Sequence, residues 1–213
     1  MHDCRRAIDA ALEQILAPAP QAVVVVGAGT RTRRYESGVR GSLAPVGVDV
    51  RVHLGGDAAT DSAPLLPVSL TLGAWMLERA GWSGRTSALE VATDEDPQVC
   101  RALGEALADD PSRLALMVVA DGTARRGAKA PGYTDERAAG FDEGWVRAVA
   151  AADAAGLAAI HPHQAEDLMM AGRAPLHVLA AAAGTTPASS ELLYSDDPYG
   201  VQYVVATWRY PRG

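Results

Sequence analysis

Two runs of consecutive apolar residues constrain the fold of this chain more than any other feature. The first, Ala22–Val26, reads AVVVV, and the second, Leu114–Ala120, reads LALMVVA. A strand with one solvated face alternates apolar and polar residues, whereas an unbroken apolar run indicates a strand that is covered on both faces. A third strand candidate, Thr86–Ala92, lies between them. With 213 residues, the chain has the length of one sizeable α/β domain.

Helical periodicity and turn residues divide the rest of the chain. The segment Asp3–Ala17 repeats apolar residues at helical spacing, with Asp3 as a candidate N-cap and Pro18 as the stop. No internal repeat and no linker interrupts the sequence, so we expect a single domain over residues 1–213. The further helix candidates are Val68–Ala80, Pro97–Ala108, Thr134–Ala152 and shorter segments within Ala154–Ile160, Gln164–Ala171 and Leu176–Ala183; the further strand candidates are Val46–Leu54, Glu191–Tyr194 and Val201–Trp208.

Composition argues against several classes of protein. The formal net charge of -7 disfavours nucleic-acid binding, because phosphate contacts need clustered basic surface. No apolar run approaches the ~20 residues that a membrane-spanning helix needs, and the charged, amphipathic N-terminus lacks the pattern of a secretory signal. Cys4 and Cys100 form no CxxC pattern, which is typical of the reducing cytoplasm and makes structural zinc improbable. We therefore expect a cytoplasmic protein that binds neither nucleic acid nor membrane.

The loop that follows Leu114–Ala120 is the strongest candidate for a functional site. It reads DGTARRGAKAPGY, residues 121–133, and precedes a long helical pattern. Ligands of open α/β sheets bind at the carboxyl ends of the strands, where this loop is expected. Asp121 at the strand tip needs a partner, or it must become protonated. The alternative interpretation is a solvated surface turn that Asp121 only pins in place.

Basic and aromatic residues surround Asp121 in the sequence. Arg125, Arg126 and Lys129 are within reach along the chain and would either pair with Asp121 or hold an anionic substrate. Tyr199 lies in the turn SDDPYG near the end of the chain and would line the same rim if its strand runs alongside.

Two places in the sequence combine histidine with carboxylates, the ligands of mixed metal sites. They are His53 with Asp57 and Asp61, and the pair His161 and His163 with Glu166 and Asp167. Surface histidines explain both patterns more simply. The turn Gly27-Ala28-Gly29 is similar to a phosphate-binding turn, but position 32 is Thr where a third glycine is required, and no helical pattern follows.

The 121–133 loop also resembles a motif of a known family. Asp121-Gly122-Thr123-Ala124-Arg125-Arg126 with Lys129-Ala130-Pro131-Gly132-Tyr133 is similar to the actinobacterial LigB-like branch of the class III extradiol ring-cleavage dioxygenases. Val23–Gly27, Leu66–Leu77 and Asp196–Trp208 agree with that family in the same order, so the resemblance spans nearly the whole chain. It implies a three-layer α/β fold with a central, largely parallel sheet flanked by helices. It also implies descent from oxidoreductases that open catechol rings with Fe(II), which two histidines and a carboxylate hold.

The histidines of that family do not carry over to this chain. The family's first histidine lies on an N-terminal strand that has no counterpart before Asp3–Ala17. The positions that match its other histidines hold Gly27-Ala28-Gly29, Ser62 and Ala124, while Asp121 keeps its type and a serine becomes Thr123. Without imidazoles to bind iron or to act as a general base, the usual ring-opening chemistry lacks its catalytic groups.

The resemblance and its departures leave three hypotheses. The first is a LigB-like protein with a degenerate metal site that binds, or acts on, a small molecule, anionic if the basic residues contact it. Asp121 would be the catalytic residue, and the substrate-binding residues would be Thr123, Arg125, Arg126, Lys129, Tyr133, Asp57, Asp61 and Tyr199. The second is an active dioxygenase with unexpected ligands such as His53, and only this hypothesis requires a cofactor, Fe(II). The third is a non-catalytic subunit that assembles through its Ala-rich helices with itself or with a partner chain.

Overall fold

The computed structural model describes residues 2–55 and 65–211, and its centre is a four-stranded sheet. β1 (Ala22–Gly29) pairs in parallel with β5 (Arg85–Ala92) on one side and with β6 (Leu114–Val119) on the other. The short β2 (Arg33–Tyr35) runs antiparallel along the outer edge of β5. The order β2-β5-β1-β6 places the valines of β1 inside the sheet, as their unbroken run predicts.

Helices cover one face of this sheet through alternate valines of β1. Val23 and Val25 point to this face and belong to a core cluster with residues of α1 (His2–Leu16) and α2 (Val68–Arg79). The two helices share this cluster and therefore lie on the same face of the sheet. Both valines are fully buried, so this face of the strand is covered as the sequence pattern predicts.

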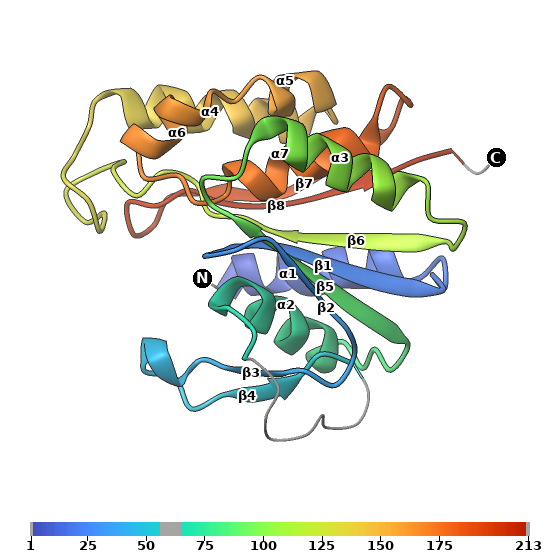
Figure 1. Cartoon of the computed structure of the whole chain (residues 1–213). Helices are drawn as coiled ribbons and strands as arrows, with labels where there is room; N and C mark the ends of the chain where they lie inside the picture. The colour runs from blue at the N-terminus through green and yellow to red at the C-terminus, as the bar shows by residue number, and fades with distance from the viewer. Residues whose placement is uncertain (1, 56–64, 212–213) are drawn as a thin grey trace.

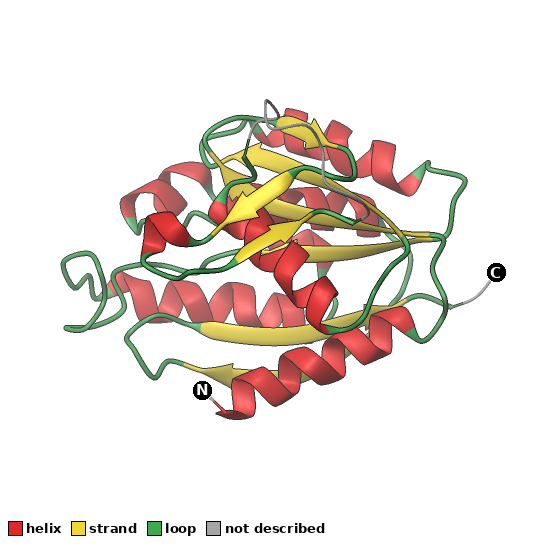
Figure 2. Ribbon diagram, turned by 90° about the horizontal axis from the view of Figure 1, so that it is seen from below, coloured by secondary structure: helices red, strands yellow, loops and turns green. Residues whose placement is uncertain are grey.

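Helices also cover the opposite face. Val24 and Val26 pack there against α3 (Pro97–Ala108) and α7 (Arg173–Ala183). Figure 1 shows the layers edge-on, and Figure 2 shows helices across the strands on the face that is seen from below. The expected three-layer α/β fold, with one domain and a largely parallel sheet between helices, is confirmed.

Two hairpins and three further helices complete the described part of the chain. β3 (Arg40–Ser42) and β4 (Arg51–His53) form a hairpin beside α2, joined through the short 3-10 helix η1 (Ala44–Val46). β7 (Ser189–Asp196) and β8 (Tyr203–Arg209) form a second hairpin, which packs between α1 and α4 (Arg137–Ala150). The helices α5 (Ala154–Ala158) and α6 (Pro162–Asp167) connect α4 to α7. No helix of residues 2–55 and 65–211 is long and apolar enough to cross a membrane.

The strand predicted over Val46–Leu54 was largely wrong. Only Arg51–His53 pairs as a strand, in β4. Pro45 lies in η1, and Gly47 follows with a φ of 80°, a left-handed conformation that ends the turn and that a β-branched residue rarely adopts. Val46 and Val48 consequently remain exposed, by 57% and 46%. Alternating valines therefore formed a turn here, because the proline and the glycine determine the backbone locally.

The topology brings the carboxyl ends of three strands to one edge. Because β1, β5 and β6 are parallel, these ends lie together, on the left of Figure 1. The helix that follows β1 along the chain, α2, covers one face of the sheet, whereas α3 and α4, which follow β5 and β6, pack on the other. Such a reversal opens a crevice beside the strand tips, where α/β proteins bind ligands.

Candidate functional site

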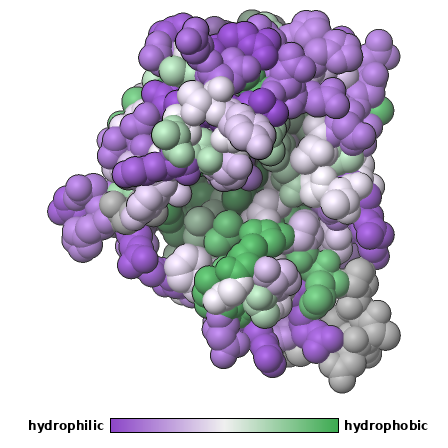
Figure 3. Space-filling view, turned by 90° about the vertical axis from the view of Figure 1, so that its left-hand side faces the viewer, coloured by the Kyte–Doolittle hydropathy of each residue, from purple (hydrophilic) through white to green (hydrophobic). Residues whose placement is uncertain are grey.

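The edge formed by the carboxyl ends of the strands is hollowed (Figure 3). The space-filling view shows hydrophilic residues over the upper part of this side and a group of apolar residues below the hollow. The loop after β6 and the turn between β7 and β8 both extend to this side of the molecule (Figure 1). The hollow therefore lies where the topology predicts a binding site.

Asp121 follows the end of β6 and presents a carboxylate without a hydrogen-bond or ion-pair partner in the described part of the chain. Its backbone carbonyl accepts a hydrogen bond from the Gly172 N–H at 3.0 Å, which ties the strand tip to the start of α7. The side chain is open to solvent, but the surrounding walls remove part of its hydration, and this desolvation raises the pKa of the carboxyl. A hydrogen-bond donor from outside the protein would stabilise this group.

Two tyrosines of the β7–β8 hairpin lie near Asp121. The pKa of Tyr203 is raised, chiefly by burial and further by neighbours that include Tyr199 and Asp121. Tyr199 is 54% exposed, and its ring meets that of Tyr203 edge-on, with centroids 6.4 Å apart. The structure therefore brings the predicted pair Asp121 and Tyr199 to one edge. Tyr203 was missed, since an aromatic residue within an apolar strand pattern gives no sign that it lies near Asp121.

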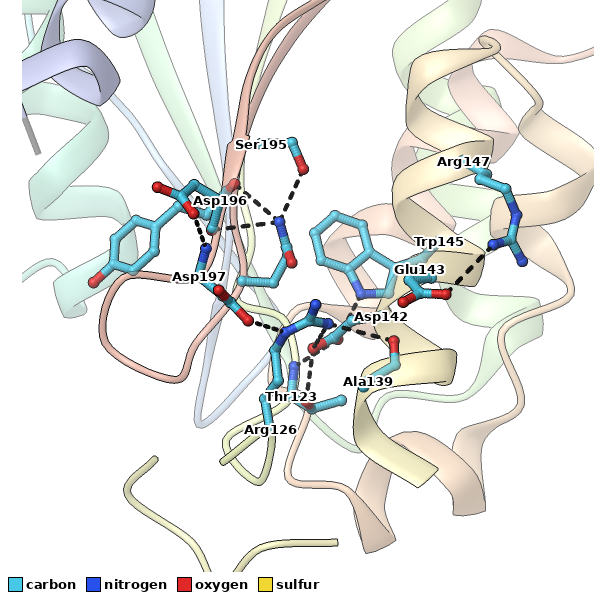
Figure 4. Close-up of polar contacts among 12 residues, drawn as sticks. Thr123, Arg126, Ala139, Asp142, Glu143, Trp145, Arg147, Ser195, Asp196 and Asp197 are labelled. Atoms are coloured by element: carbon cyan, nitrogen blue, oxygen red, sulfur yellow. Dashed lines mark hydrogen bonds and ion pairs between the residues drawn. The ribbon is translucent and has the colours of Figure 1, made fainter. Parts of the chain in front are cut away.

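A buried carboxylate organises the start of the 121–133 loop (Figure 4). Asp142 of α4 is 0% exposed. It accepts hydrogen bonds from the Thr123 N–H at 3.0 Å, from the Thr123 hydroxyl at 2.8 Å and from Trp145 Nε1 at 2.8 Å. Thr123 is also 0% exposed. The structure thus buries this predicted substrate-binding residue, with its hydroxyl already bonded to Asp142.

Arg126 connects this buried cluster to the β7–β8 turn. Its Nε donates to Asp197 at 2.7 Å, and its Nη1 lies 3.7 Å from Asp142 and donates to the Ala139 carbonyl at 3.3 Å. The three contacts, visible in Figure 4, join the loop, α4 and the hairpin turn. Two carboxylates neutralise the guanidinium, so Arg126 serves the fold and has no free charge for an anionic substrate.

Arg125 lies on another side of the loop from Asp121. The residue is half-buried, and its Nε is buried without a hydrogen-bond partner in the described part of the chain. Arg125 acts instead on Asp135, whose pKa is lowered chiefly by hydrogen bonds from Arg137 and to a smaller extent by the Arg125 charge. For Asp121, desolvation is the one cause of the pKa shift. The loop therefore does not supply Asp121 with a neutralising cation.

The remaining predicted residues do not join the group around Asp121. Lys129 is exposed without an ion pair to any described residue, and Tyr133 is 90% exposed. A side chain at Gly200 of the hairpin turn would touch the backbone of Lys129, so this part of the loop packs against the turn. Asp57 and Asp61 lie outside the described residues.

The histidines do not assemble a metal site within the described ranges. His53 is exposed on β4, and His161 and His163 are exposed at the start of α6, with ring centroids 5.6 Å apart. No group of three His, Cys, Asp or Glu side chains among residues 2–55 and 65–211 is arranged to hold a metal ion. The two histidines and one carboxylate that hold Fe(II) in extradiol enzymes therefore have no counterpart in this part of the chain.

The glycine turn after β1 accommodates a buried carboxylate of the protein. A side chain at Gly29 would overlap Glu90 of β5. Glu90 is 3% exposed and accepts hydrogen bonds from Thr30 N–H at 2.9 Å, from Arg31 N–H at 3.3 Å and from the Tyr35 hydroxyl at 2.6 Å. These donors are thus used within the fold, and the turn is followed by β2 instead of a helix, as its sequence predicts.

Comparisons with known proteins identify the fold alone. No protein-family model and no curated protein matches the sequence. Among solved structures, the chain is similar to the uncharacterized protein JW3007 from Escherichia coli K12, with a TM-score of 0.61 and 14% sequence identity over 93% of this chain and 90% of that one. A likeness at this identity supports a shared α/β architecture and carries no function with it.

Proposed function

We propose that this chain is a diverged LigB-like protein that binds a small hydroxylated aromatic molecule in the hollow beside Asp121. The unpartnered carboxylate of Asp121 carries the proposal. It lies at the carboxyl end of β6, an edge strand of the sheet, where the connections reverse, and it has no donor in the described part of the chain. A ligand hydroxyl would donate the missing hydrogen bond.

The surroundings of Asp121 suit an aromatic ring. Tyr199 and Tyr203 contribute aromatic surface beside it, and aromatic pairs are stabilised by edge-to-face contacts. The raised pKa of Asp121 brings the carboxyl closer to the range in which it can take a proton from a phenol and return it. Proton exchange with a bound hydroxyl is therefore the chemistry that this group would support.

The resemblance of the loop to extradiol dioxygenases supports the aromatic character of the ligand but not an iron-dependent reaction. The family's histidine positions hold Gly27-Ala28-Gly29, Ser62 and Ala124 in this sequence. We therefore propose binding, with proton transfer at Asp121, and assign no step to iron.

A thermal-shift series tests the proposal with three matched probes: catechol, phenol and 1,2-dimethoxybenzene, which shares the ring and cannot donate a hydrogen bond. Saturating ligand stabilises a protein by RT ln(1 + [L]/Kd), about 2.7 kcal/mol at a hundredfold excess over Kd. We expect catechol to stabilise the wild type, dimethoxybenzene to have little effect, and Asp121→Asn to lose the response to catechol.

Two control variants separate binding from folding. Tyr203→Phe keeps the ring and should retain part of the response. Glu143→Gln, on the exposed side of α4 (Figure 4), should retain all of it. An unchanged response in Asp121→Asn would reject the site, and equal responses to the three probes would reject recognition of a hydroxyl.

A further inference from the structure

Arg173, the first residue of α7, is a buried cation without a counter-ion among the residues that the structure describes. It is 2% exposed, and its Nη2 donates to the backbone carbonyls of Thr93 at 3.0 Å and Glu95 at 2.7 Å. Its Nη1 is buried and has no partner in the described part of the chain, and no described carboxylate forms an ion pair with it. Removing a charge from water is costly unless an opposite charge compensates it, and two carbonyl dipoles do so only in part.

The guanidinium lies where two helices begin. Glu95, which accepts one of its hydrogen bonds, directly precedes Asp96, the N-cap of α3. The two helices run side by side in the same direction, so closely that a side chain at Gly104 of α3 would overlap the Val178 carbonyl of α7 (Figure 1). Their N-termini, which carry the positive ends of the helix dipoles, therefore meet beside Arg173.

The start of α7 adds free backbone donors. Its N-cap, Gly172, makes no side-chain cap, and its own N–H is donated to Asp121. The N–H groups of Arg173 and Ala174 have no partner within the helix, and no other acceptor in the described chain bonds them. Ala174 is 0% exposed, so at least one of these donors is buried beside the cation.

The nearby acidic groups Glu95 and Asp96 form their hydrogen bonds with other residues and make no ion pair with the guanidinium. The Glu95 carboxylate bonds the Thr32 hydroxyl and the Asp96 N–H, and the Asp96 carboxylate caps α3 at Gln98 N–H. Burial raises the pKa of the Cys100 thiol to about 11, and burial, with the charge of Arg173, lowers the pKa of His177. Both groups are thus neutral at physiological pH, and no side chain in the described part of the chain forms an ion pair with the positive charge.

We infer that the starts of α3 and α7 form a binding site for an oxyanion, a phosphate or carboxylate group, held by Arg173 Nη1 and the N–H groups of Arg173 and Ala174. Guanidinium and helix N-terminal donors are the groups that proteins use for such anions. The cover over the site is thin, since Thr93, Asp94 and Asp96 of the β5–α3 loop are exposed. This inference stands on Arg173 and does not depend on the aromatic ligand proposed above.

The anion has two possible sources, a free phosphate ion or the anionic group of the molecule bound beside Asp121. The second is sterically close, because the Gly172 N–H that precedes Arg173 bonds the Asp121 carbonyl. Titration with inorganic phosphate tests the site itself. Titration with 3,4-dihydroxybenzoate against catechol tests whether one molecule reaches both groups.

Amide NMR and thermal shift of the full chain decide the proposal. With ionic strength held constant by chloride, we expect phosphate to shift the amide resonances of Arg173 and Ala174 and to raise the Tm. Arg173→Met should weaken phosphate binding by about tenfold or more, whereas Asp121→Asn should leave it unchanged. Asp121→Asn also distinguishes the two proposals, because losing the hydroxyl site beside Asp121 would not alter the response to phosphate.

Three outcomes would overturn the oxyanion site. They are the absence of a phosphate-specific amide shift in the wild type, a shift that chloride reproduces, and an undiminished phosphate affinity in folded Arg173→Met. If Arg173→Met does not fold, the wild-type amide shifts decide alone. A gain in affinity for 3,4-dihydroxybenzoate over catechol identifies the anionic group of the ligand as the source, and equal affinities identify a free anion.

Discussion

Two carboxylates associated with the 121–133 loop differ in almost every respect. Asp142 is fully buried and accepts three hydrogen bonds, with Arg126 Nη1 3.7 Å away. Asp121 is exposed to solvent and has no side-chain partner in the described part of the chain. The first carboxylate is satisfied by the fold, whereas the second is kept in surroundings that raise its pKa.

The difference separates a structural acid from a candidate functional one. A buried charge is tolerated only when its partners replace water, and Asp142 has such partners from the loop, from α4 and from Arg126. An unpaired and partly dehydrated carboxylate does not stabilise the fold at neutral pH, so it is the kind of group that a protein retains for binding or proton transfer. Substitution of Asp142 should therefore lower the stability of the protein, whereas substitution of Asp121 should remove the ligand response without lowering stability.

The largest effect is expected for Asp142→Ala. The change leaves the Thr123 N–H, its hydroxyl and Trp145 Nε1 without their acceptor and should lower the free energy of unfolding by about 3–5 kcal/mol. Urea denaturation measures the loss. Glu143→Ala is the matched control, because its ion pair with Arg147 is exposed and should contribute less than about 0.5 kcal/mol. Similar losses for both variants would contradict a structural role for Asp142.

An intermediate effect is expected for Arg126→Met. The side chain of Arg126 is 15% exposed and lies between the buried Asp142 and Asp197, whose side chain is 48% exposed. Removing the cation leaves Asp142 without its counter-charge, and we expect a loss of about 1–3 kcal/mol. Asp197→Ala breaks only the outer ion pair and should cost about 0.2–1 kcal/mol. A larger loss of stability in Asp197→Ala than in Arg126→Met would show that the stabilising contact is the one at the hairpin turn.

The smallest effect is expected for Asp121→Asn, and it has the opposite sign. The folded-state pKa of Asp121 is raised above its ordinary value of 3.8, so the folded state binds more protons than the unfolded state between these two values. Its contribution to stability is thus greatest below the unfolded pKa and falls as pH rises through the folded pKa. Asp121→Asn should remove this fall and leave neutral-pH stability equal or higher by at most about 0.5 kcal/mol.

Denaturation at a series of pH values, from below the ordinary aspartate pKa to neutral, measures the Asp121 effect. Asp110→Asn is the control, because the pKa of Asp110 is shifted in the opposite direction: hydrogen bonds from Ser112 lower it. Its contribution is present above the unfolded pKa and is lost as pH falls through the folded pKa. A marked loss of neutral-pH stability in Asp121→Asn would show that the carboxylate has a structural partner after all.

Much of the fold was predictable because local patterns and tertiary environment agree. The unbroken valines of β1 required cover on both faces and received it from four helices. Asp96 and Pro97 start α3 as their cap pattern predicts, with the Asp96 carboxylate accepting from Gln98 N–H at 2.7 Å. The local pattern and the structure disagree at Val46–Leu54, where Pro45 and Gly47 form a turn in a segment whose alternating pattern predicts a strand.

The candidate site was less predictable, because closeness in sequence does not specify the direction in which neighbouring side chains point. Thr123 and Arg125 are two residues apart, yet one bonds the buried Asp142 and the other lies toward Asp135. Asp142 occupies a polar position of a helix, which in a sequence is typical of a solvated face. Tyr203 and Arg173 carried no distinguishing pattern either, since a strand aromatic and a basic residue near a helix start are common in ordinary folds.

The amino-acid sequence by itself determined the strands that need cover on both faces, most helices, and the loop that follows β6. These features follow from runs, periods and caps over a few neighbouring residues. Only the tertiary structure decided which charges are neutralised. Asp142 received its donors from Thr123 of the loop and from Trp145. Arg173 received carbonyls from residues about eighty positions away in sequence, and Asp121 received no side-chain partner from the described part of the chain. Pairing of charges depends on which chain segments meet in space, and the same composition can therefore leave a carboxylate satisfied or open to a ligand.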